Sequence, residues 1–126
     1  MQQNSLYILD DADKGRCVFA GKEFAKGDII EICPIIKVSS VDRKVIHETG
    51  LHDYYFVWGA ADKEAAIALG YGSLYNHSST PNAQFVNDLK ESCIIIECIV
   101  KINAGQEILL NYIDDTVKDK VWFEEK

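Results

Sequence analysis

Short apolar runs, separated by polar turns, make up most of this chain. Their β-branched and aromatic residues are typical of strands rather than helices. We expect strands at 6–9, 17–20, 29–38, 54–58, 83–86, 93–100 and 107–112. Turns are expected at 10–15, 25–28 and 102–106, where glycine and polar residues gather. The pattern therefore predicts a mostly β protein built from many short strands.

Two segments depart from this simple alternation. Pro34 cannot donate a hydrogen bond to a sheet, so the 29–38 segment is expected to be split, bulged or at an edge. Residues 63–69, "KEAAIAL", predict the one short helix, with Asp62 as its N-cap and Gly70 placed to end it. Residues 39–50 are polar and show no clear period, so no element is predicted there.

Length and composition favour one globular domain that spans residues 1–126. The chain is 48% hydrophobic and 26% charged, and it contains neither a linker nor a repeat. Its N-terminus lacks the basic start and apolar core of a signal peptide. The longest apolar-rich run, 93–100, is too short to span a bilayer and is interrupted by Glu97. We therefore expect a soluble, intracellular protein that does not enter a membrane.

Cysteine spacing and net charge exclude several classes of site. The four cysteines lie in apolar, strand-like segments, and none forms a C-x-x-C pair or extends to a histidine at zinc spacing. Neither a metal site nor a disulfide framework is expected. The net charge of −7 argues against direct nucleic-acid binding, which needs a basic face. It suits a basic partner such as a lysine-rich peptide.

The segment "NHSSTPN" (76–82) concentrates hydrogen-bonding side chains between apolar neighbours. Asn76-His77-Ser78 matches the glycosylation pattern Asn-x-Ser, an interpretation that falls away for an intracellular protein. The segment then forms either an elaborate polar loop or a turn that holds a small ligand. Tyr112 also allows two interpretations. Its hydroxyl either reaches water from the core or faces a reaction centre.

Three segments, taken in order, resemble the SET-domain protein lysine methyltransferases. They are "GRCVFAGKEFAKGDIIE" (15–31), "YGSLYNHSSTPNA" (71–83) and "GQEILLNY" (105–112). The resemblance covers residues 6–123 and is greatest to the minimal SET proteins of viruses and bacteria, which lack flanking zinc domains. It implies several small curved sheets with a short helix and a C-terminal pseudoknot, a rare exception to unthreaded topology. That topology would bring residues 75–78 and 109–112 into one site.

The resemblance also implies a reaction, the transfer of a methyl group from S-adenosylmethionine to a lysine amine. The backbone of residues 15–17 would hold the methionine end of the cofactor, and the side chain of Asn76 would bond its amino-acid portion. The main chain of His77 would read the adenine edge, and an aromatic residue of the tail would stack on the ring. The cofactor-binding residues implied in this way are Gly15, Arg16, Cys17, Asn76, His77, Trp122 and Phe123.

Two tyrosines are implied at the reacting end of the site. Tyr112 would place its hydroxyl at the methyl-transfer point, and Tyr54 would line the channel for the substrate lysine. Asn82 would brace the threaded loop rather than touch a ligand. The substrate would be a basic, histone-like or other protein, reached in the cytoplasm or, in a eukaryotic host, in the nucleus. A homodimer is a possible assembly.

Several positions differ from the family pattern. Arg16 stands where an aromatic residue is usual in the minimal proteins, and Cys17 replaces a glycine. Gln106 replaces a glutamate, and Thr116 falls where some relatives carry a channel tyrosine. Two hypotheses therefore stand: an active protein lysine methyltransferase, or a catalytically idle SET-fold module that binds the cofactor or a basic peptide.

Overall fold

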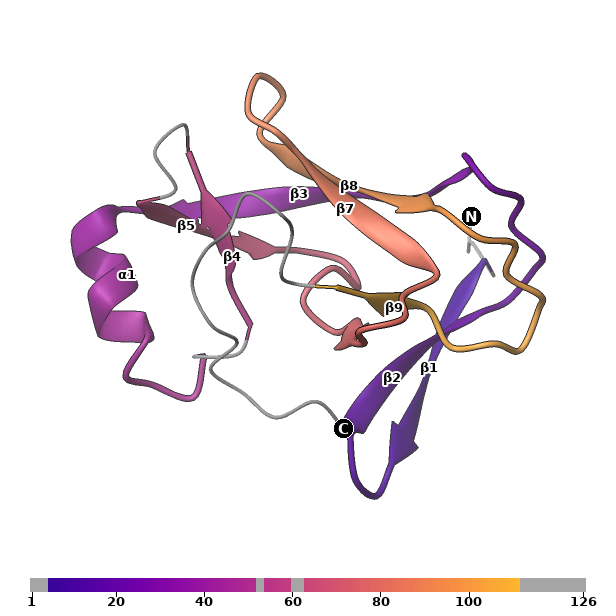
Figure 1. Ribbon diagram of the computed structural model, residues 1–126. Helices are drawn as coiled ribbons and strands as arrows, with labels where there is room; N and C mark the ends of the chain where they lie inside the picture. Colours follow the sequence, from indigo (N-terminus) through magenta and orange to yellow (C-terminus); the bar gives the residue numbers. More distant parts are fainter. Residues whose placement is uncertain (1–4, 52–53, 60–62, 112–126) are drawn as a thin grey trace.

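The computed structural model describes residues 5–51, 54–59 and 63–111. The elements follow the order β1 (Leu6–Asp11), β2 (Gly15–Ala20), β3 (Ile29–Val38), α1 (Ser40–Ile46), β4 (Phe56–Trp58), β5 (Glu64–Ala68), β6 (Asn76–His77), β7 (Ala83–Asp88), β8 (Cys93–Cys98) and β9 (Leu109–Leu110) (Figure 1). The predicted mostly β class with one short helix is confirmed for this part of the chain. The C-terminal segment of the predicted pseudoknot lies outside the described residues from Tyr112 onward.

The largest sheet has five antiparallel strands in the order β4-β5-β3-β8-β7. Its central strand, β3, changes partner at the proline. The pairing with β8 ends at Pro34, opposite Cys93, and the pairing with β5 begins at Ile35, opposite Ala68. Of the three expected alternatives, the edge position is wrong, whereas the pairing of the segment is split at Pro34 and β3 has a register shift between Ile29 and Glu31. A change of partner accommodates the missing N–H without breaking the strand.

The predicted helix over residues 63–69 is wrong, because Glu64–Ala68 form strand β5. Three alanines of this strand are buried, and it lies between β3 and β4. Alanine favours helices on its own, but small side chains also fit a strand that is covered closely on both sides. Sheet pairing therefore overrides local propensity here. Asp62, the predicted N-cap, lies outside the described residues.

The helix forms instead at Ser40–Ile46, where the sequence showed no period. Ser39 caps it by accepting a hydrogen bond from the N–H of Asp42 at 3.2 Å. None of the helix side chains is buried, so no apolar face marks it in the sequence. This seven-residue helix is far too short to cross a membrane, and the described part of the chain contains no candidate span.

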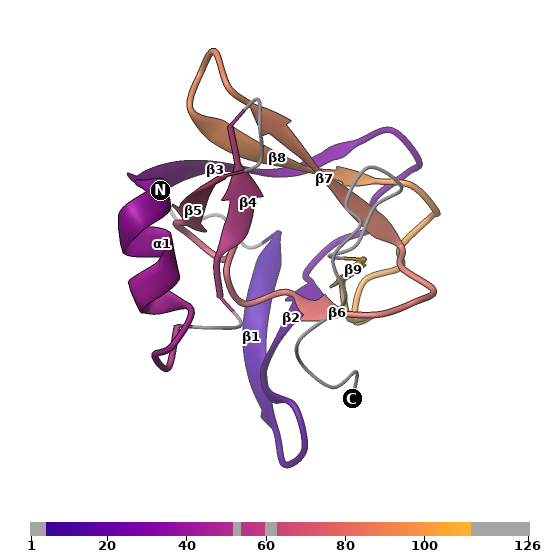
Figure 2. The same cartoon turned by 60° about the vertical axis from the view of Figure 1, so that its left-hand side comes forward.

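Two small sheets lie beside the large one (Figures 1 and 2). One of them joins segments that are distant in the sequence. β1 and β2 form an antiparallel hairpin, whereas β6 and β9 pair in parallel although they are far apart in the sequence. The segment that leads into β9 also bonds to β2, because the N–H of Ile108 donates to the carbonyl of Val18 at 2.9 Å. Residues 106–110 thus contact β2 first and β6 next.

The hydrophobic core fixes the orientation of this connecting segment. Ile108 and Leu110 are fully buried, together with Val18 of β2 and residues of β8. Glu107 and Leu109 alternate with them and are only partly buried. Because side chains alternate along an extended chain, burial of Ile108 and Leu110 turns Glu107 away from the core. This alternation places a carboxylate beside the start of β2.

Candidate functional site

A polar cluster forms where the start of β2, strand β6 and the segment before β9 meet. The side-chain amide of Asn76 donates through Nδ2 to Glu107 Oε2 at 2.7 Å and to the carbonyl oxygen of Arg16 at 3.3 Å. It also contacts Cys17 Sγ at 3.3 Å. Three of the predicted cofactor-binding residues are therefore neighbours in space, although Asn76 lies about sixty residues from the other two.

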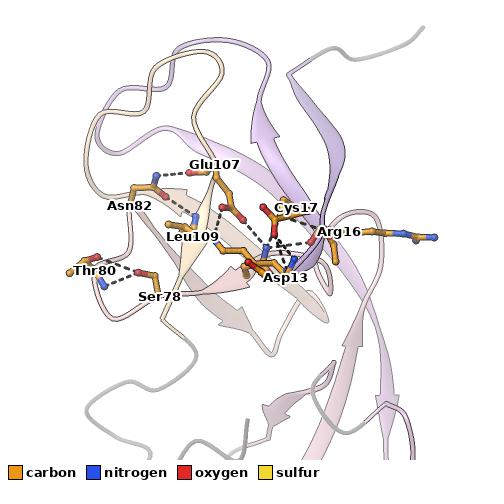
Figure 3. Close-up of polar contacts among 12 residues, drawn as sticks. Asp13, Arg16, Cys17, Ser78, Thr80, Asn82, Glu107 and Leu109 are labelled. Atoms are coloured by element: carbon orange, nitrogen blue, oxygen red, sulfur yellow. Dashed lines mark hydrogen bonds and ion pairs between the residues drawn. The ribbon is translucent and has the colours of Figure 1, made fainter. Parts of the chain in front are cut away.

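Glu107 lies at the centre of this cluster (Figure 3). Its second carboxylate oxygen, Oε1, accepts from Lys14 Nζ at 2.9 Å. This hydrogen bond raises the pKa of Lys14 above its ordinary value. The Glu107 side chain is 15% exposed and that of Lys14 is 24% exposed, so the pair is partly shielded from water. Sequence reasoning missed both residues, although the G-Q-E segment that contains Glu107 was recognised as a motif.

The turn before β2 has a defined shape. The carboxylate of Asp11 accepts from the backbone N–H groups of Asp13 at 2.8 Å and Lys14 at 3.1 Å. These two bonds lower the pKa of Asp11. Gly15 follows with φ +79°, a left-handed conformation that favours glycine, and a Cβ there would meet no atom of the described residues within 4 Å. The turn thus presents Lys14 to Glu107 and leaves space around Gly15.

Arg16 and Cys17 contribute to the cluster in different ways. The side chain of Arg16 points away from the cluster, so only its backbone carbonyl takes part (Figure 3). The departure from an aromatic residue at this position leaves that contact unchanged. Cys17 is buried, and burial, followed by the charge of Glu107, raises the pKa of its thiol. The sulfur is therefore a neutral thiol at physiological pH and is not suited to act as a nucleophile.

Asn82 fastens the segment before β9 to the loop that follows β6. Its Nδ2 donates to the carbonyl of Glu107 at 2.9 Å, and its Oδ1 accepts from the N–H of Leu109 at 2.9 Å (Figure 3). Both ends of the amide are used within the protein, as expected for a bracing residue. The Ser78 hydroxyl accepts from the N–H of Thr80 at 3.0 Å, a local bond that shapes the same loop.

The main chain around His77 is oriented by its pairing with β9. His77 lies opposite Leu110 in the parallel register, and the N–H of the next residue, Ser78, donates to the carbonyl of Leu110 at 2.8 Å. This pairing fixes the course of the main chain on both sides of His77.

The remaining predicted site residues are not part of the cluster that the structure describes. Tyr54 precedes β4 of the five-stranded sheet and is 45% exposed, and its N–H donates to the carbonyl of Leu51. Tyr112, Trp122 and Phe123 lie outside the described residues, as does Thr116. The roles assigned to these residues, and to the members of the polar cluster, stay predictions.

Comparison with known proteins gives consistent results. The SET domain family model matches residues 15–113. The chain is 30% identical over 125 residues to a Schizosaccharomyces pombe protein described as a histone-lysine N-methyltransferase, H3 lysine-37 specific, covering 98% of this chain and 80% of that protein.

Two solved structures are also similar. A putative histone methyltransferase of Plasmodium falciparum has a TM-score of 0.67 and 31% identity, covering 88% of this chain and 95% of that one. CpSET8 of Cryptosporidium has a TM-score of 0.67 and 26% identity, covering 86% of this chain and 57% of that one. These likenesses confirm the predicted fold class of small curved sheets.

Proposed function

We propose that this chain, which belongs to the SET-domain family and is a protein-lysine methyltransferase, takes its methyl group from S-adenosylmethionine and delivers it to a lysine of a basic protein. One observation carries the choice of donor. Asn76, assigned to the amino-acid portion of the cofactor, lies against the Arg16 carbonyl of the loop assigned to the same portion. Residues that the family pattern places around one ligand thus meet in this structure.

The chemistry of the cluster fits the amino-acid end of this cofactor. That end carries an ammonium group and a carboxylate. The Arg16 carbonyl is an acceptor for an ammonium group, and Lys14, beside the Glu107 carboxylate, supplies a cation nearby. The space around Gly15 allows a ligand to approach the backbone closely.

S-adenosylmethionine supplies an activated methyl group on a positively charged sulfur. The protein has to hold the acceptor lysine neutral and in line with that methyl group. Desolvation of the lysine lowers its pKa and so favours the neutral amine. Alignment of the reacting atoms is a positioning task worth several kcal/mol. We assign Tyr112 to the transfer point, Tyr54 to the lysine channel, and Trp122 or Phe123 to the adenine ring.

The proposed substrate is a basic, histone-like protein. The net charge of −7 favours encounter with a positively charged partner. The Schizosaccharomyces pombe relative is described as specific for a lysine of histone H3, which supports a substrate of this class. A histone substrate would place the chain in the nucleus. The proposed likeness to minimal viral and bacterial SET proteins rests on the sequence motifs alone.

Substitution of Tyr112 by phenylalanine tests the catalytic assignment. We expect Tyr112→Phe to remain folded and to bind S-adenosylhomocysteine almost as well as the wild type does. Its turnover should fall roughly 100-fold to 1000-fold, the size of effect seen when one preorganised hydrogen-bond donor is lost. Turnover is measured by mass spectrometry on histone H3 and other basic proteins, and affinity by calorimetry.

Tyr7→Phe is the matched control, because Tyr7 is partly exposed on β1 and is expected to tolerate the change. Wild-type turnover in folded Tyr112→Phe would remove Tyr112 from the reaction. The choice of donor is tested separately, since a ligand specific for the folded state raises the melting temperature. A wild-type protein whose melting temperature does not change with saturating S-adenosylmethionine would overturn that choice.

A further inference from the structure

We infer that Glu107 is a positioning residue that turns the side-chain amide of Asn76 so that its oxygen, Oδ1, faces the amino-acid end of the cofactor. The inference rests on the proposed function, because it concerns the same binding site. Glu107 itself was not among the residues that the sequence motifs assigned to the cofactor. Its role follows from the hydrogen bonds of the cluster.

The first step concerns the orientation of the Asn76 amide. An asparagine side chain has a donor end and an acceptor end, and a carboxylate only accepts. The 2.7 Å contact with Glu107 Oε2 must therefore be made by Nδ2. The Arg16 carbonyl, on the same side, is also an acceptor and requires the same orientation. Because the amide is planar, Oδ1 then points away from Glu107.

The second step concerns which neighbour dominates that choice. The bond to Glu107 is the shortest of the three contacts of Nδ2, and it is assisted by the charge of the carboxylate. The contacts with the Arg16 carbonyl and the Cys17 sulfur are both 3.3 Å. Loss of the carboxylate leaves only these two weaker contacts to hold the amide.

The third step concerns how Glu107 is itself held. Lys14 donates to Oε1, Asn82 donates to the backbone carbonyl of Glu107, and Glu107 forms a β-bridge with Phe19 of β2. Both carboxylate oxygens accept from a donor. Glutamine has the same shape but only one acceptor oxygen, and when that oxygen faces the charged Lys14 an NH2 group faces Asn76 Nδ2. Glu107→Gln is therefore a small change with a specific consequence for Asn76.

The experiment compares two ligands that differ in the amino-acid portion. S-adenosylhomocysteine carries it, whereas 5′-methylthioadenosine lacks both its ammonium and its carboxylate. We expect Glu107→Gln to weaken the binding of S-adenosylhomocysteine about tenfold, which is the effect of losing one good polar contact. The affinity for 5′-methylthioadenosine should change less than about twofold, since that ligand does not reach Oδ1. Calorimetry measures both dissociation constants.

The matched control is Glu97→Gln. Glu97 also accepts a side-chain amide hydrogen bond, from Gln84 Nε2 at 2.6 Å, but it lies on β8 of the five-stranded sheet. Neither ligand should distinguish Glu97→Gln from the wild type. If Glu107→Gln weakened the binding of both ligands equally, Glu107 would have a structural role. That result would overturn the inference.

A double-mutant cycle separates action through Asn76 from direct contact with the ligand. If Glu107 acts through Asn76, Glu107→Gln should cost no further affinity for S-adenosylhomocysteine in an Asn76→Ala background. An equal loss in both backgrounds would mean that Glu107 acts independently of Asn76. If Glu107→Gln does not fold, Glu107→Asp withdraws the carboxylate from Asn76 while keeping its charge, and the same pattern is expected.

A ligand-free measurement distinguishes failure of this inference from failure of the proposed function. Nuclear magnetic resonance of the unliganded protein reports the side-chain amide signals of Asn76. These signals should shift in Glu107→Gln and stay in place in Glu97→Gln. Unchanged signals in Glu107→Gln overturn the positioning role whatever the ligand is. Shifted signals in a protein that binds neither ligand would overturn the proposed function instead.

Discussion

Two glutamates in this molecule make the same kind of double hydrogen bond in very different surroundings. Glu31, on the central strand β3, accepts from the Tyr75 hydroxyl at 2.6 Å and from the backbone N–H of Tyr71 at 2.9 Å. Glu107 accepts from Lys14 and Asn76. The donors to Glu31 are a buried hydroxyl and a backbone group, whereas the donors to Glu107 are polar side chains of the candidate site.

The space around the two carboxylates differs as well. Near Glu31, a Cβ on Gly70 would collide with the Glu31 carboxylate, and one on Gly72 would come within 2.9 Å of Cys33 Sγ. Burial there raises the pKa of the Cys33 thiol strongly. Near Glu107, a Cβ on Gly15 would meet nothing within 4 Å among residues 5–51, 54–59 and 63–111. The Glu31 carboxylate therefore lies in a closely packed region. Beside the Glu107 carboxylate, the described residues leave space around Gly15.

The comparison shows that one geometry can serve two purposes. A carboxylate that satisfies donors within a packed region ties the 71–75 loop to the sheet and so contributes to stability. In the proposed site, a carboxylate that holds one end of an amide and directs the other end elsewhere would contribute to recognition. The surroundings of each donor decide between the two roles.

The largest expected difference is in the free energy of unfolding. Glu31→Gln removes the charge and replaces one acceptor oxygen by an NH2 group, so the bonds to the Tyr71 N–H and to the hydroxyl of Tyr75, which is only 2% exposed, are no longer charge-assisted. We expect a loss of about 1.5–3 kcal/mol, typical for a hydrogen bond to a charged group. Glu107→Gln, in a partly exposed ion pair, should lose about 1 kcal/mol or less. Urea unfolding of both variants measures the difference.

The losses of affinity for S-adenosylhomocysteine should follow the opposite order, with the larger loss in Glu107→Gln. S-adenosylhomocysteine should bind folded Glu31→Gln as it binds the wild type. A larger loss of stability in Glu107→Gln than in Glu31→Gln would contradict the division between a stabilising and a recognising carboxylate.

A smaller effect is expected when the donor rather than the acceptor is removed. Tyr75→Phe keeps the buried ring and deletes the hydroxyl that bonds Glu31 Oε1. We expect a loss of about 1–2 kcal/mol, because the carboxylate retains its bond to the N–H of Tyr71. Combined with Glu31→Gln, the losses should be less than additive, since both changes remove one shared bond. Strictly additive losses, measured by the same unfolding experiment, would show that the two residues stabilise the fold independently.

The smallest expected effect is a pH dependence of the free energy of unfolding. It arises from the ion pair of Glu107 with Lys14, which has no counterpart at Glu31 within the residues that the structure describes. The pKa of Lys14 is raised in the folded protein, so its ion pair stabilises the fold at neutral pH and loses that contribution as pH rises through the folded-state pKa, above 10.5. Lys14→Met should be less stable than the wild type by about 0.5 kcal/mol or less at pH 7–9. The difference should shrink above pH 10.5. A difference that stays constant across this range, measured by urea unfolding at each pH, would show that Lys14 contributes through packing rather than charge.

Most strands of the large sheet were predictable from the sequence, but strand β5 and the pairing of the strands were not. The segments 29–38 and 83–86 are rich in β-branched or aromatic residues, and both form strands. The alanines at 65, 66 and 68 suggested a helix because their role depends on strands that lie far away in the sequence. The helix at 40–46 lacks a buried face, so no period revealed it.

The candidate site shows the same division between local and long-range information. The motifs identified Asn76 and the 15–17 loop, and the structure brings them together. Glu107 was overlooked because its importance comes from contacts with Lys14 and Asn76, which no local pattern encodes. The two-residue strands β6 and β9 are likewise too short to show any periodicity.

The parallel pairing of β6 with β9 has a consequence for the newly made chain. Asn76 lies opposite Leu109, which the ribosome adds 33 residues later. At about 5–20 residues per second, the delay is roughly 2–7 seconds. The hairpins β1–β2 and β7–β8 can form before Leu109 is added, because their strands are neighbours in sequence. During synthesis residues 76–77 must therefore wait for their partner strand, and the polar cluster of the candidate site can close only after the strands of both hairpins have been made.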